Sequence, residues 1–293
     1  MKNKPDLIIT SDWHLREDKP VGRTDDYWSE MWAKVDFISD LQRKYECPVV
    51  HGGDLFHHWK PSPMLLSETI EHIPCNFYTI YGQHDLPQHN LDLAYKSGIQ
   101  TLVKAEKLTI FDGCHFGQLP NEASILIHIS KTETKKVLVW HTFNYQGKLP
   151  WPGGTSPTGR KLLKQYPEYD LIITGDNHKT FVEEYQGRVL VNPGSLMRSN
   201  ADQIDHKPCV FLYYSETNSV KRVFLPINEG VISREHIEKT EERELRIDAF
   251  INKLKDETQS FFSFEDNVEA LINSNEDLHK KTKELIYNAL DND

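Results

Sequence analysis

The stretch Asp6-Leu-Ile-Ile-Thr-Ser-Asp-Trp-His14 decides the fold class, because a short apolar run ends in an aspartate and a histidine. After Asp6, residues 7–10 are aliphatic or β-branched, which predicts a buried strand over 6–10. The chain then alternates, with a helix predicted over 25–45, a strand over 48–50, a helix over 63–72 and a strand over 76–81. This βαβαβ start predicts an α/β fold with helices on both faces of a sheet.

The rest of the chain falls into two parts. Further strands are predicted over 107–111, 123–129, 137–140 and 171–174, and hairpin-like strands over 180–192 and 208–225. Residues 145–159 are rich in Gly, Pro and Thr, which predicts a long loop of the kind that often has a function. After residue 228 the chain becomes charged and takes helical spacing. We therefore expect a folded body over 1–228 and an acidic helical appendage over 229–293.

Composition excludes several classes of protein. The chain has 293 residues, of which 38% are apolar and 27% charged, as in soluble globular proteins. No uncharged apolar run approaches the roughly 20 residues of a membrane span, and the first residues show no signal-peptide pattern. The four cysteines are scattered without a CxxC pair, which indicates buried thiols in a reducing compartment. These features predict a cytoplasmic location and no membrane association.

Charge is distributed unevenly along the chain. Residues 226–293 hold 17 of the 44 acidic residues but only 9 of the 34 basic ones. The body is therefore close to neutral although the whole chain has a net charge of −10. Bound divalent cations would make the body positive, so charge does not exclude a nucleic-acid partner. The acidic tail itself is not expected to bind DNA.

Polar side chains follow five of the predicted strands. They are Asp12 and His14, Asp54, His84 and Asp85, His141, and Asp176 and His178. In an open α/β sheet the carboxyl ends of the strands form the ligand-binding edge, so packing alone does not explain five such motifs. Mixed imidazole and carboxylate groups suit Mn, Fe, Zn or Co. A shared carboxylate such as Asp54 can bridge two cations about 4 Å apart, an arrangement that suits phosphoryl transfer. No GxSxG or GxxxxGK[ST] motif supports acyl transfer or nucleotide-driven work.

The series Asp-x-His, Gly-Asp, Gly-Gln-His-Asp, His and Gly-Asp-Asn-His resembles the motifs of the calcineurin-like metallophosphoesterases. The resemblance implies a four-layer α/β/β/α double-sheet core with two metals. It implies that one metal is held by Asp12, His14 and His178, the other by Gln83, His141 and Asp176, and both by the bridging Asp54. It further implies that His84 protonates the leaving oxygen or stabilises the transition state, and that Asp85 fixes the tautomer and orientation of His84.

Two of these positions depart from the family pattern. Gln83 stands where Asn is usual, and its extra methylene moves the amide oxygen by about 1.5 Å. Asp176 stands where His is usual. Both side chains can still bind a metal. The added carboxylate should favour manganese, or magnesium, over zinc at the second site.

Other segments resemble a narrower group, the SbcD-type DNA repair nucleases. The segments are Gly53-Asp-Leu-Phe-His57 with Lys60-Pro-Ser62, and Asn192-Pro-Gly-Ser-Leu-Met-Arg198 with Ala201-Asp-Gln203 and Asp205-His-Lys-Pro208. The whole resemblance covers residues 6–225. It implies a metal-dependent DNA nuclease, the catalytic subunit of a repair or recombination complex, in which His57 contacts substrate phosphate. Arg198 would bind phosphate or form a structural ion pair.

The same resemblance suggests partners. Nucleases of this group act with an SMC-like coiled-coil ATPase (SbcC-type) and usually form homodimers. We therefore expect the C-terminal region to dock that ATPase, with the aromatic cluster Phe261–Phe264 as an anchor. A pair of helices that only completes the core is the simpler alternative.

Two other functions share the core motifs. One is a small-substrate phosphodiesterase or phosphatase, and the other is a non-catalytic scaffold. The segment Gly53–Ser62 and the helical tail favour the nuclease. Trp13 and Trp59 flank the motifs and could stack on unpaired bases, although packing is the favoured interpretation.

Overall fold

The computed structural model describes residues 4–120, 125–128, 134–149, 151–258, 264–274, 280 and 282–284. The chain divides into two compact units, residues 1–233 and 234–293. Residues 229–233 stay with the first unit, because Ser233 N donates to Gly22 O (2.8 Å) and Thr24 N donates to Val231 O (3.1 Å). The sequence placed this boundary at residue 228.

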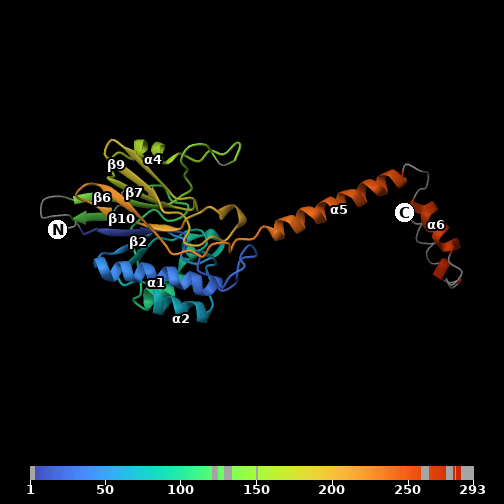
Figure 1. Ribbon diagram of the computed structural model, residues 1–293, viewed down its shortest axis with the longest axis horizontal. Coiled ribbons are helices and arrows are strands. Elements are labelled where there is room, and N and C mark those ends of the chain that lie inside the picture. The colour runs from blue at the N-terminus through green and yellow to red at the C-terminus, as the bar shows by residue number, and fades with distance from the viewer. Residues whose placement is uncertain are drawn as a thin grey trace. The chain divides into compact units, whose positions relative to one another are not determined.

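The first unit contains two mixed β-sheets (Figure 1). The six strands of the first sheet are, in spatial order, β11 (Ser219–Phe224), β10 (Cys209–Tyr214), β1 (Leu7–Thr10), β2 (Val49–His51), β3 (Phe77–Thr79) and β4 (Thr109–Ile110). The five strands of the second sheet are β5 (Ile125–His128), β6 (Thr134–His141), β7 (Leu171–Gly175), β9 (Arg188–Asn192) and β8 (Phe181–Tyr185). Strands β1 to β4 are parallel to one another, as are β6, β7 and β9.

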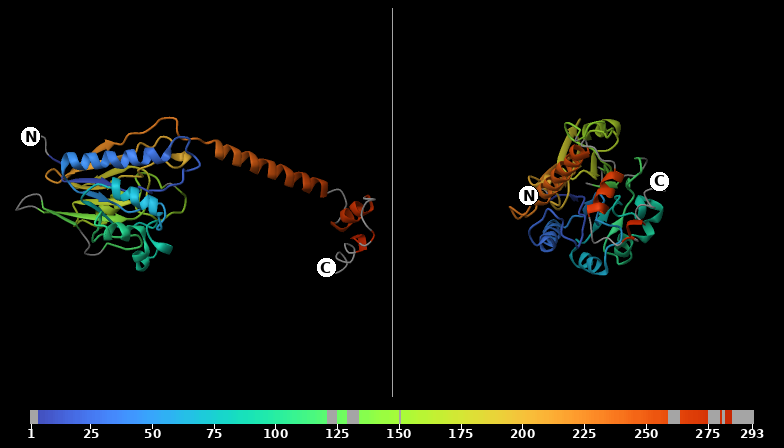
Figure 2. Two further views of the ribbon diagram at one scale, coloured as in Figure 1. Left: turned by 90° about the horizontal axis from the view of Figure 1, so that it is seen from below. Right: turned by 90° about the vertical axis from the view of Figure 1, so that its right-hand side faces the viewer.

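Helices cover the outer face of each sheet. They are α1 (Tyr27–Tyr45), α2 (Pro63–His72) and α3 (Gly98–Lys104) on the first sheet, and α4 (Gly159–Gln165) on the second. Figure 1 shows α1 and α2 on the opposite side of the sheets from α4, and Figure 2 shows the same layers from below.

Strand alternation builds three apolar clusters between these layers. Ile8 of β1 packs toward the helices α1 to α3, whereas its neighbours Leu7 and Ile9 pack between the sheets. On β7, Ile173 faces the first sheet and Ile172 faces α4. The predicted α/β fold with a four-layer α/β/β/α double-sheet core is confirmed.

Local sequence explains where the helices begin and end. The Ser62 hydroxyl accepts a hydrogen bond from Leu65 N (3.1 Å) and Pro63 occupies the first turn, so α2 begins as the sequence predicts. Asp26 caps α1 by accepting from Ser29 N (3.1 Å), and the helix ends at Glu46 in the left-handed region.

The sequence missed α3 and α4, which are seven residues each. Too few apolar positions fall in one or two turns to show a helical period. The loop predicted over 145–159 is present, with Tyr145 bridged to Thr158 before α4 begins. The cysteines form no disulfide, and Cys47, Cys114 and Cys209 are buried as predicted. Cys75 is exposed, so the prediction of four buried thiols is wrong at that position.

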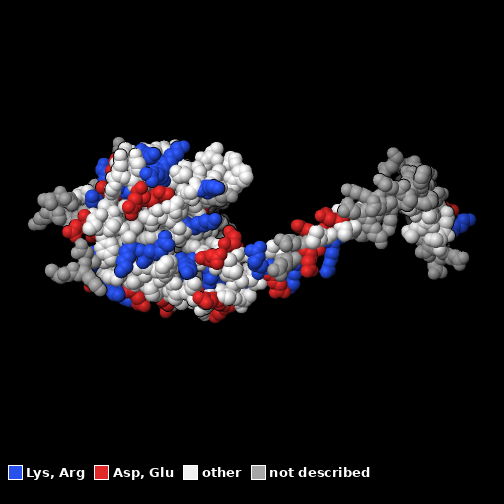
Figure 3. All heavy atoms as spheres, turned by 45° about the horizontal axis from the view of Figure 1, so that its top comes forward, with Lys and Arg blue, Asp and Glu red and all other residues white. Residues whose placement is uncertain are grey.

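The second unit contains α5 (Glu235–Thr258) and α6 (Phe264–Ser274). Ion pairs at i,i+4 spacing join Lys239 to Glu235 (2.6 Å) and Arg246 to Glu242 (3.6 Å) along α5. Figure 3 shows acidic and basic side chains along this helix. Of the predicted Phe261–Phe264 anchor, only the backbone of Phe264 belongs to the described residues. No helix in the described part of the chain is both long and apolar enough to cross a membrane.

Candidate metal centre

The predicted site residues meet where strands of the two sheets end. Asp12 and His14 follow β1, Asp54 follows β2, and Gln83, His84 and Asp85 follow β3; His141 ends β6, and Asp176 and His178 follow β7. Four of these residues have left-handed backbone conformations, which cost free energy for any residue but glycine: Asp12 (φ 50°), His14 (φ 46°), Asp54 (φ 57°) and Asp176 (φ 78°). Such strain at one place marks a functional site.

A first group of ligand atoms surrounds the imidazole of His14. Its Nε2 lies 3.0 Å from Nε2 of His178, 3.6 Å from Oδ2 of Asp54 and 4.0 Å from Oδ1 of Asp12. Asp12, His14 and His178 offer ligand atoms that all lie within 4.8 Å of one another, as a metal ion requires. These are the three residues that the family resemblance assigned to one metal.

A second group surrounds His141. Its Nε2 lies 3.6 Å from Oδ2 of Asp54, and Asp12, Asp54 and His141 again offer ligand atoms within 4.8 Å of one another. The amide oxygen of Gln83 is 2.7 Å from the same nitrogen, and its amide nitrogen donates to Asp176 Oδ1 (2.6 Å). Asp12 thus belongs to both groups, whereas the sequence gave only Asp54 a bridging role.

Unpartnered buried atoms show that these residues fit metal ions. Asp12 Oδ2, Asp54 Oδ2 and His14 Nδ1 are buried and have no hydrogen-bond partner within the described chain. Other groups hold the remaining oxygens in place, because Asp54 Oδ1 accepts from His84 N (2.8 Å) and Asp12 Oδ1 accepts from Asp176 N (3.0 Å). Unpartnered buried carboxylate oxygens are costly, and a divalent cation would satisfy them.

Two glycines make room for this arrangement. A Cβ on Gly53, whose φ is +98°, would lie 2.5 Å from Nδ1 of His141. A Cβ on Gly82 would overlap the carboxylate of Asp54. The glycine beside each motif therefore lets the two sheets bring their side chains into contact.

Burial and neighbouring charges shift the pKa values in the centre. Burial raises the pKa of Asp12 and lowers that of His14 well below its usual value. Burial would also lower the pKa of His141, but the carboxylates of Asp54, Asp12 and Asp176 raise it to about 10. Burial alone would raise the pKa of Asp54, but the neighbouring imidazoles of His141, His14 and His84 lower it below its usual value. The centre therefore attracts cations, and a metal must displace a proton from it.

Residues 6–216 match the model of the calcineurin-like phosphoesterase superfamily domain, which is more than half of the chain. The chain belongs to the calcineurin-like phosphoesterase superfamily. No curated protein is similar enough to count as a relative. The predicted identification of this superfamily is confirmed.

Several solved structures are similar to this superfamily member. An archaeal phosphodiesterase is 17% identical with a TM-score of 0.43, covering 75% of this chain and 99% of its own. Vacuolar protein sorting 29 from Cryptosporidium parvum is 16% identical with a TM-score of 0.35, covering 76% and 97%. A candidate 5′-nucleotidase from Staphylococcus aureus is 15% identical with a TM-score of 0.44, covering 81% and 58%. None of these three is named as a DNA nuclease.

His84 lies beside the centre, but its orientation has a different cause from the one predicted. Its Nδ1 donates to the carbonyl oxygen of His57 (2.9 Å), which fixes the ring. The carboxylate of Asp85 instead accepts from three backbone amides, those of Leu55 (3.3 Å), Phe56 (3.0 Å) and Gly82 (3.0 Å). Burial raises the pKa of Asp85 to about 7. The role predicted for Asp85 is therefore corrected: its carboxylate ties two motif loops together, and the His57 carbonyl orients the ring of His84.

The two predicted substrate contacts differ in position. His57 is half-buried beside the centre, and its imidazole belongs to a third group with His14 and His84 whose ligand atoms lie within 4.8 Å. Burial lowers the pKa of His57 to about 4. Arg198 is buried, and its guanidinium donates to the carbonyl oxygens of Ile204 and Asn228. Arg198 therefore holds backbone in place, with no carboxylate as its partner among the described ion pairs.

Arg16, which was not among the predicted site residues, borders the centre. Arg16 lines the small hollow, of about 100 Å³, that contains Asp12, His14 and His84. Its guanidinium pairs with Asp18, and its place two residues after His14 was the signal available in the sequence. Trp13 is fully buried and donates to the Thr10 hydroxyl (2.8 Å), so packing is its role.

Proposed function

We propose that the chain hydrolyses phosphodiester bonds with two divalent cations and that its substrate is a DNA strand. One observation carries the proposal: ligand atoms of Asp12, His14, Asp54, His141 and His178 face one another at the ends of strands from both sheets, and several are buried without a partner. The donor set of imidazoles, carboxylates and one amide suits manganese, with magnesium as the alternative.

The residues of the chain have separate tasks in this proposal. When bound, the two cations supply an activated water and positive charge at the phosphate. His84 keeps Nδ1–H on the carbonyl of His57, so only its Nε2 can act on the substrate. Once that ring is doubly protonated, Nε2–H can donate to the leaving oxygen. Asp85 holds the loops that present His84 and Asp54, through backbone amides of both.

DNA as the substrate rests on the segments that resemble SbcD-type nucleases. Gly53–His57 lies at the centre, and Ser195, Met197 and Ser199 line the same small hollow. Both resembling segments therefore border the position of the scissile phosphate.

The second candidate is hydrolysis of a small phosphodiester or nucleotide. Its support is that the same metal centre serves both, and that the superfamily match does not separate them. Two of the similar solved structures are named as a phosphodiesterase and a candidate nucleotidase. A scaffold without activity is the third.

A paired assay tests these candidates. The purified chain with manganese is given end-labelled linear and circular single-stranded DNA, and separately bis(p-nitrophenyl) phosphate. We expect manganese-dependent DNA cleavage that His84→Ala and Asp54→Ala abolish and that His58→Ala, an exposed histidine outside the centre, leaves intact. Hydrolysis of the small ester without DNA cleavage would favour the second candidate. Failure on both substrates would favour the scaffold.

We also propose that the second unit docks a coiled-coil ATPase of the SMC type. Ile247 and Ile251 are exposed one turn apart on the same face of α5, an apolar pair that a partner helix could cover. Ile247→Glu with Ile251→Glu should abolish co-purification with the co-expressed ATPase and leave hydrolysis of the small ester unchanged. Light scattering of the same samples reports whether the chain forms the homodimer that we also propose. Unchanged co-purification would contradict the docking.

A further inference from the structure

A large hollow opens beside the metal centre, and no step described so far uses it. Its volume is about 760 Å³, within the range of roughly 300–1,000 Å³ that encloses organic ligands. It shares His178, Asn200 and Gln203 with the small hollow at the centre, so the two hollows adjoin each other. A strand whose phosphate lies at His178 could therefore extend into the large hollow.

Three exposed cations line this hollow. Lys179 directly follows the ligand candidate His178, Lys207 precedes β10, and Arg222 belongs to β11. None of the three has a carboxylate within ion-pair distance in the described residues, whereas Arg16, Arg23 and Arg43 all do. Charges without a partner beside a phosphoesterase centre suit the phosphates on either side of the one that is cleaved.

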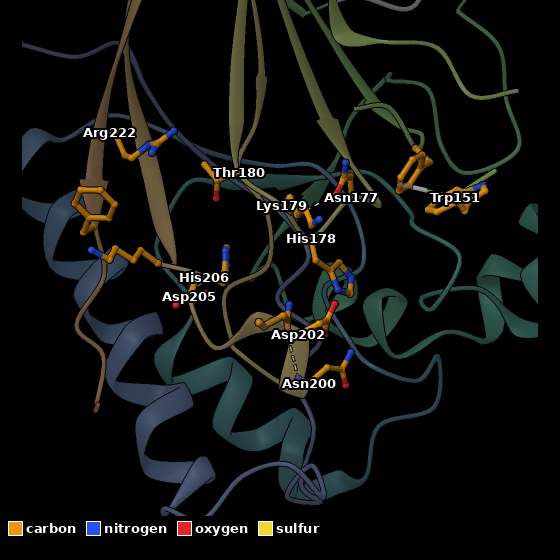
Figure 4. A pocket seen from close by; sticks show the side chains of 14 residues that line it. Trp151, Asn177, His178, Lys179, Thr180, Asn200, Asp202, Asp205, His206 and Arg222 are labelled. Atoms are coloured by element: carbon orange, nitrogen blue, oxygen red, sulfur yellow. Dashed lines mark hydrogen bonds between the residues drawn. The ribbon is translucent and has the colours of Figure 1, made fainter. Parts of the chain in front are cut away.

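Aromatic rings occupy the same hollow. Trp151 is 46% exposed and lies against Phe143, with ring centroids 4.7 Å apart. Phe224 is 53% exposed, and the guanidinium of Arg222 lies 5.9 Å from its centroid. Figure 4 shows Arg222 and Trp151 on opposite sides of His178. Exposed rings flanking a phosphate site are the usual platforms for unpaired bases.

The remaining polar groups are consistent with bases. Figure 4 shows Asn200, Asp202 and Asp205 on the side of the hollow away from Arg222 and Thr180. Carboxylates there would repel a phosphate, but they can accept hydrogen bonds from the amino groups of bases. The hollow thus offers cations for phosphates and acceptors for base edges.

We propose that this hollow holds the nucleotides next to the scissile phosphate of an unpaired polynucleotide strand. Lys179, Lys207 and Arg222 bind its phosphates, and Trp151 stacks on a base. The inference rests on the proposed phosphodiester hydrolysis and names the residues that select a single strand over a small ester.

Binding of a fluorescein-labelled oligothymidylate, followed by anisotropy over a range of salt concentrations, tests the inference. Full-length His84→Ala serves as the parent to prevent cleavage. Trp151→Ala should weaken binding roughly tenfold, because one stacked base is lost. Arg222→Gln and Lys207→Gln should each reduce the slope of log affinity against log salt by about 0.7.

Two matched controls separate a built subsite from general attraction. Lys221→Gln removes the cation next to Arg222 on β11, outside the hollow, and Tyr95→Ala removes an exposed aromatic ring elsewhere. Both should bind the oligonucleotide as the parent does. Equal losses from Lys221→Gln and Arg222→Gln would overturn the subsite, as would parent-like binding by Trp151→Ala.

Further measurements separate failure of the subsite from failure of the proposed function. In the His84-containing chain, the ratio of oligonucleotide cleavage to bis(p-nitrophenyl) phosphate hydrolysis should fall for Trp151→Ala and Arg222→Gln. A chain that hydrolyses the small ester but does not bind the oligonucleotide overturns the subsite and leaves phosphoesterase activity standing. If the chain hydrolyses neither the oligonucleotide nor bis(p-nitrophenyl) phosphate, the proposed phosphoesterase function itself is wrong. The affinity of Trp151→Ala for a duplex of the same length is also measured. If the substitution weakens binding of the duplex as much as binding of the single strand, Trp151 does not stack on an unpaired base.

Discussion

Two buried clusters of charged residues in the first unit differ in whether their charges are paired within the protein. In one, Arg23 binds Asp25 through two hydrogen bonds (2.8 and 2.6 Å), contacts Glu30, and donates to the carbonyl of Arg198 (2.9 Å); Lys34 also contacts Glu30. In the other, at the metal centre, buried oxygens of Asp12 and Asp54 accept no hydrogen bond in the described chain, and the two imidazoles that pair with Asp54 Oδ2 are 3.6 Å away. The first cluster satisfies its own charges, whereas the second needs an ion from outside.

The comparison shows how to separate a structural charge network from a functional one. Both clusters are buried, and both mix acidic and basic groups, so burial and composition do not distinguish them. What distinguishes the two clusters is whether each buried polar atom has a hydrogen-bond partner. Substitutions in the first cluster should therefore change stability, and substitutions in the second should change metal binding and catalysis.

The largest expected effect is that of Asp54→Asn on hydrolysis. The substitution keeps Oδ1 for the amide of His84 but removes the oxygen charge that faces both ligand groups. We expect activity on bis(p-nitrophenyl) phosphate to fall by about a thousandfold, or about 4 kcal/mol. Manganese should no longer raise the melting temperature. Without metal, the free energy of unfolding should fall by less than it does in Arg23→Met, because Oδ2 accepts no hydrogen bond and its contacts with the His14 and His141 imidazoles are 3.6 Å long. A large loss of metal-free stability would erase the contrast between the clusters.

Arg23→Met should have the reverse pattern. It leaves the half-buried Asp25 without its cation and the buried Glu30 with only Lys34, which should lower the free energy of unfolding by about 3 kcal/mol. Arg43→Met in α1 is the matched control, because the Arg43–Asp40 pair is exposed and should contribute less than about 1 kcal/mol. Urea unfolding measures both. Similar values for the two variants would mean that the buried network adds no stability.

Acid should weaken the first cluster in a way that depends on Asp25. Although burial opposes the shift, hydrogen bonds from Arg23 and its charge hold the pKa of Asp25 below the usual value. Because the folded pKa is the lower one, the stabilisation is complete above the unfolded pKa near 4 and is lost as pH falls below it. We expect Asp25→Asn to remove about 2 kcal/mol at neutral pH and to flatten the decline in unfolding free energy between about pH 4 and pH 2. Parallel pH curves for the two proteins would refute this role.

The sequence predicts most elements of the fold and the residues at the strand ends, but not how those residues contact one another. The strands were found because short apolar runs reflect burial on both faces, and the helix predicted over 63–72 is α2, whose start the structure assigns to the Ser62 cap and Pro63. The identity of the residues at the strand ends followed from the sheet edge on which parallel strands converge.

What the sequence could not provide is contact between side chains from different strands. The membership of Asp12 in both ligand groups depends on how the two sheets meet, and the His57 carbonyl that orients His84 is a backbone group with no sequence signal. Lys179, Lys207 and Arg222 come from separate segments and form no motif, so only the fold brings them to one hollow.

The smallest predicted effect concerns the two positions at which this chain departs from the usual family pattern. Gln83 contacts both His141 and Asp176, and its amide forms a hydrogen bond with the carboxylate. Gln83→Asn withdraws the amide by about 1.5 Å, so the hydrogen bond to the Asp176 carboxylate should be lost and manganese binding should weaken roughly tenfold.

The double variant Gln83→Asn with Asp176→His tests whether the departures compensate each other. An imidazole at 176 is larger than the carboxylate and can fill the space that the shorter amide leaves, so metal affinity should recover with a preference shifted from manganese toward zinc. Calorimetric titration with each metal gives the coupling between the two positions. If the losses of the single variants simply add in the double variant, the two residues act independently. The Gln83–Asp176 bond would then be a consequence of the site and not a determinant of its metal.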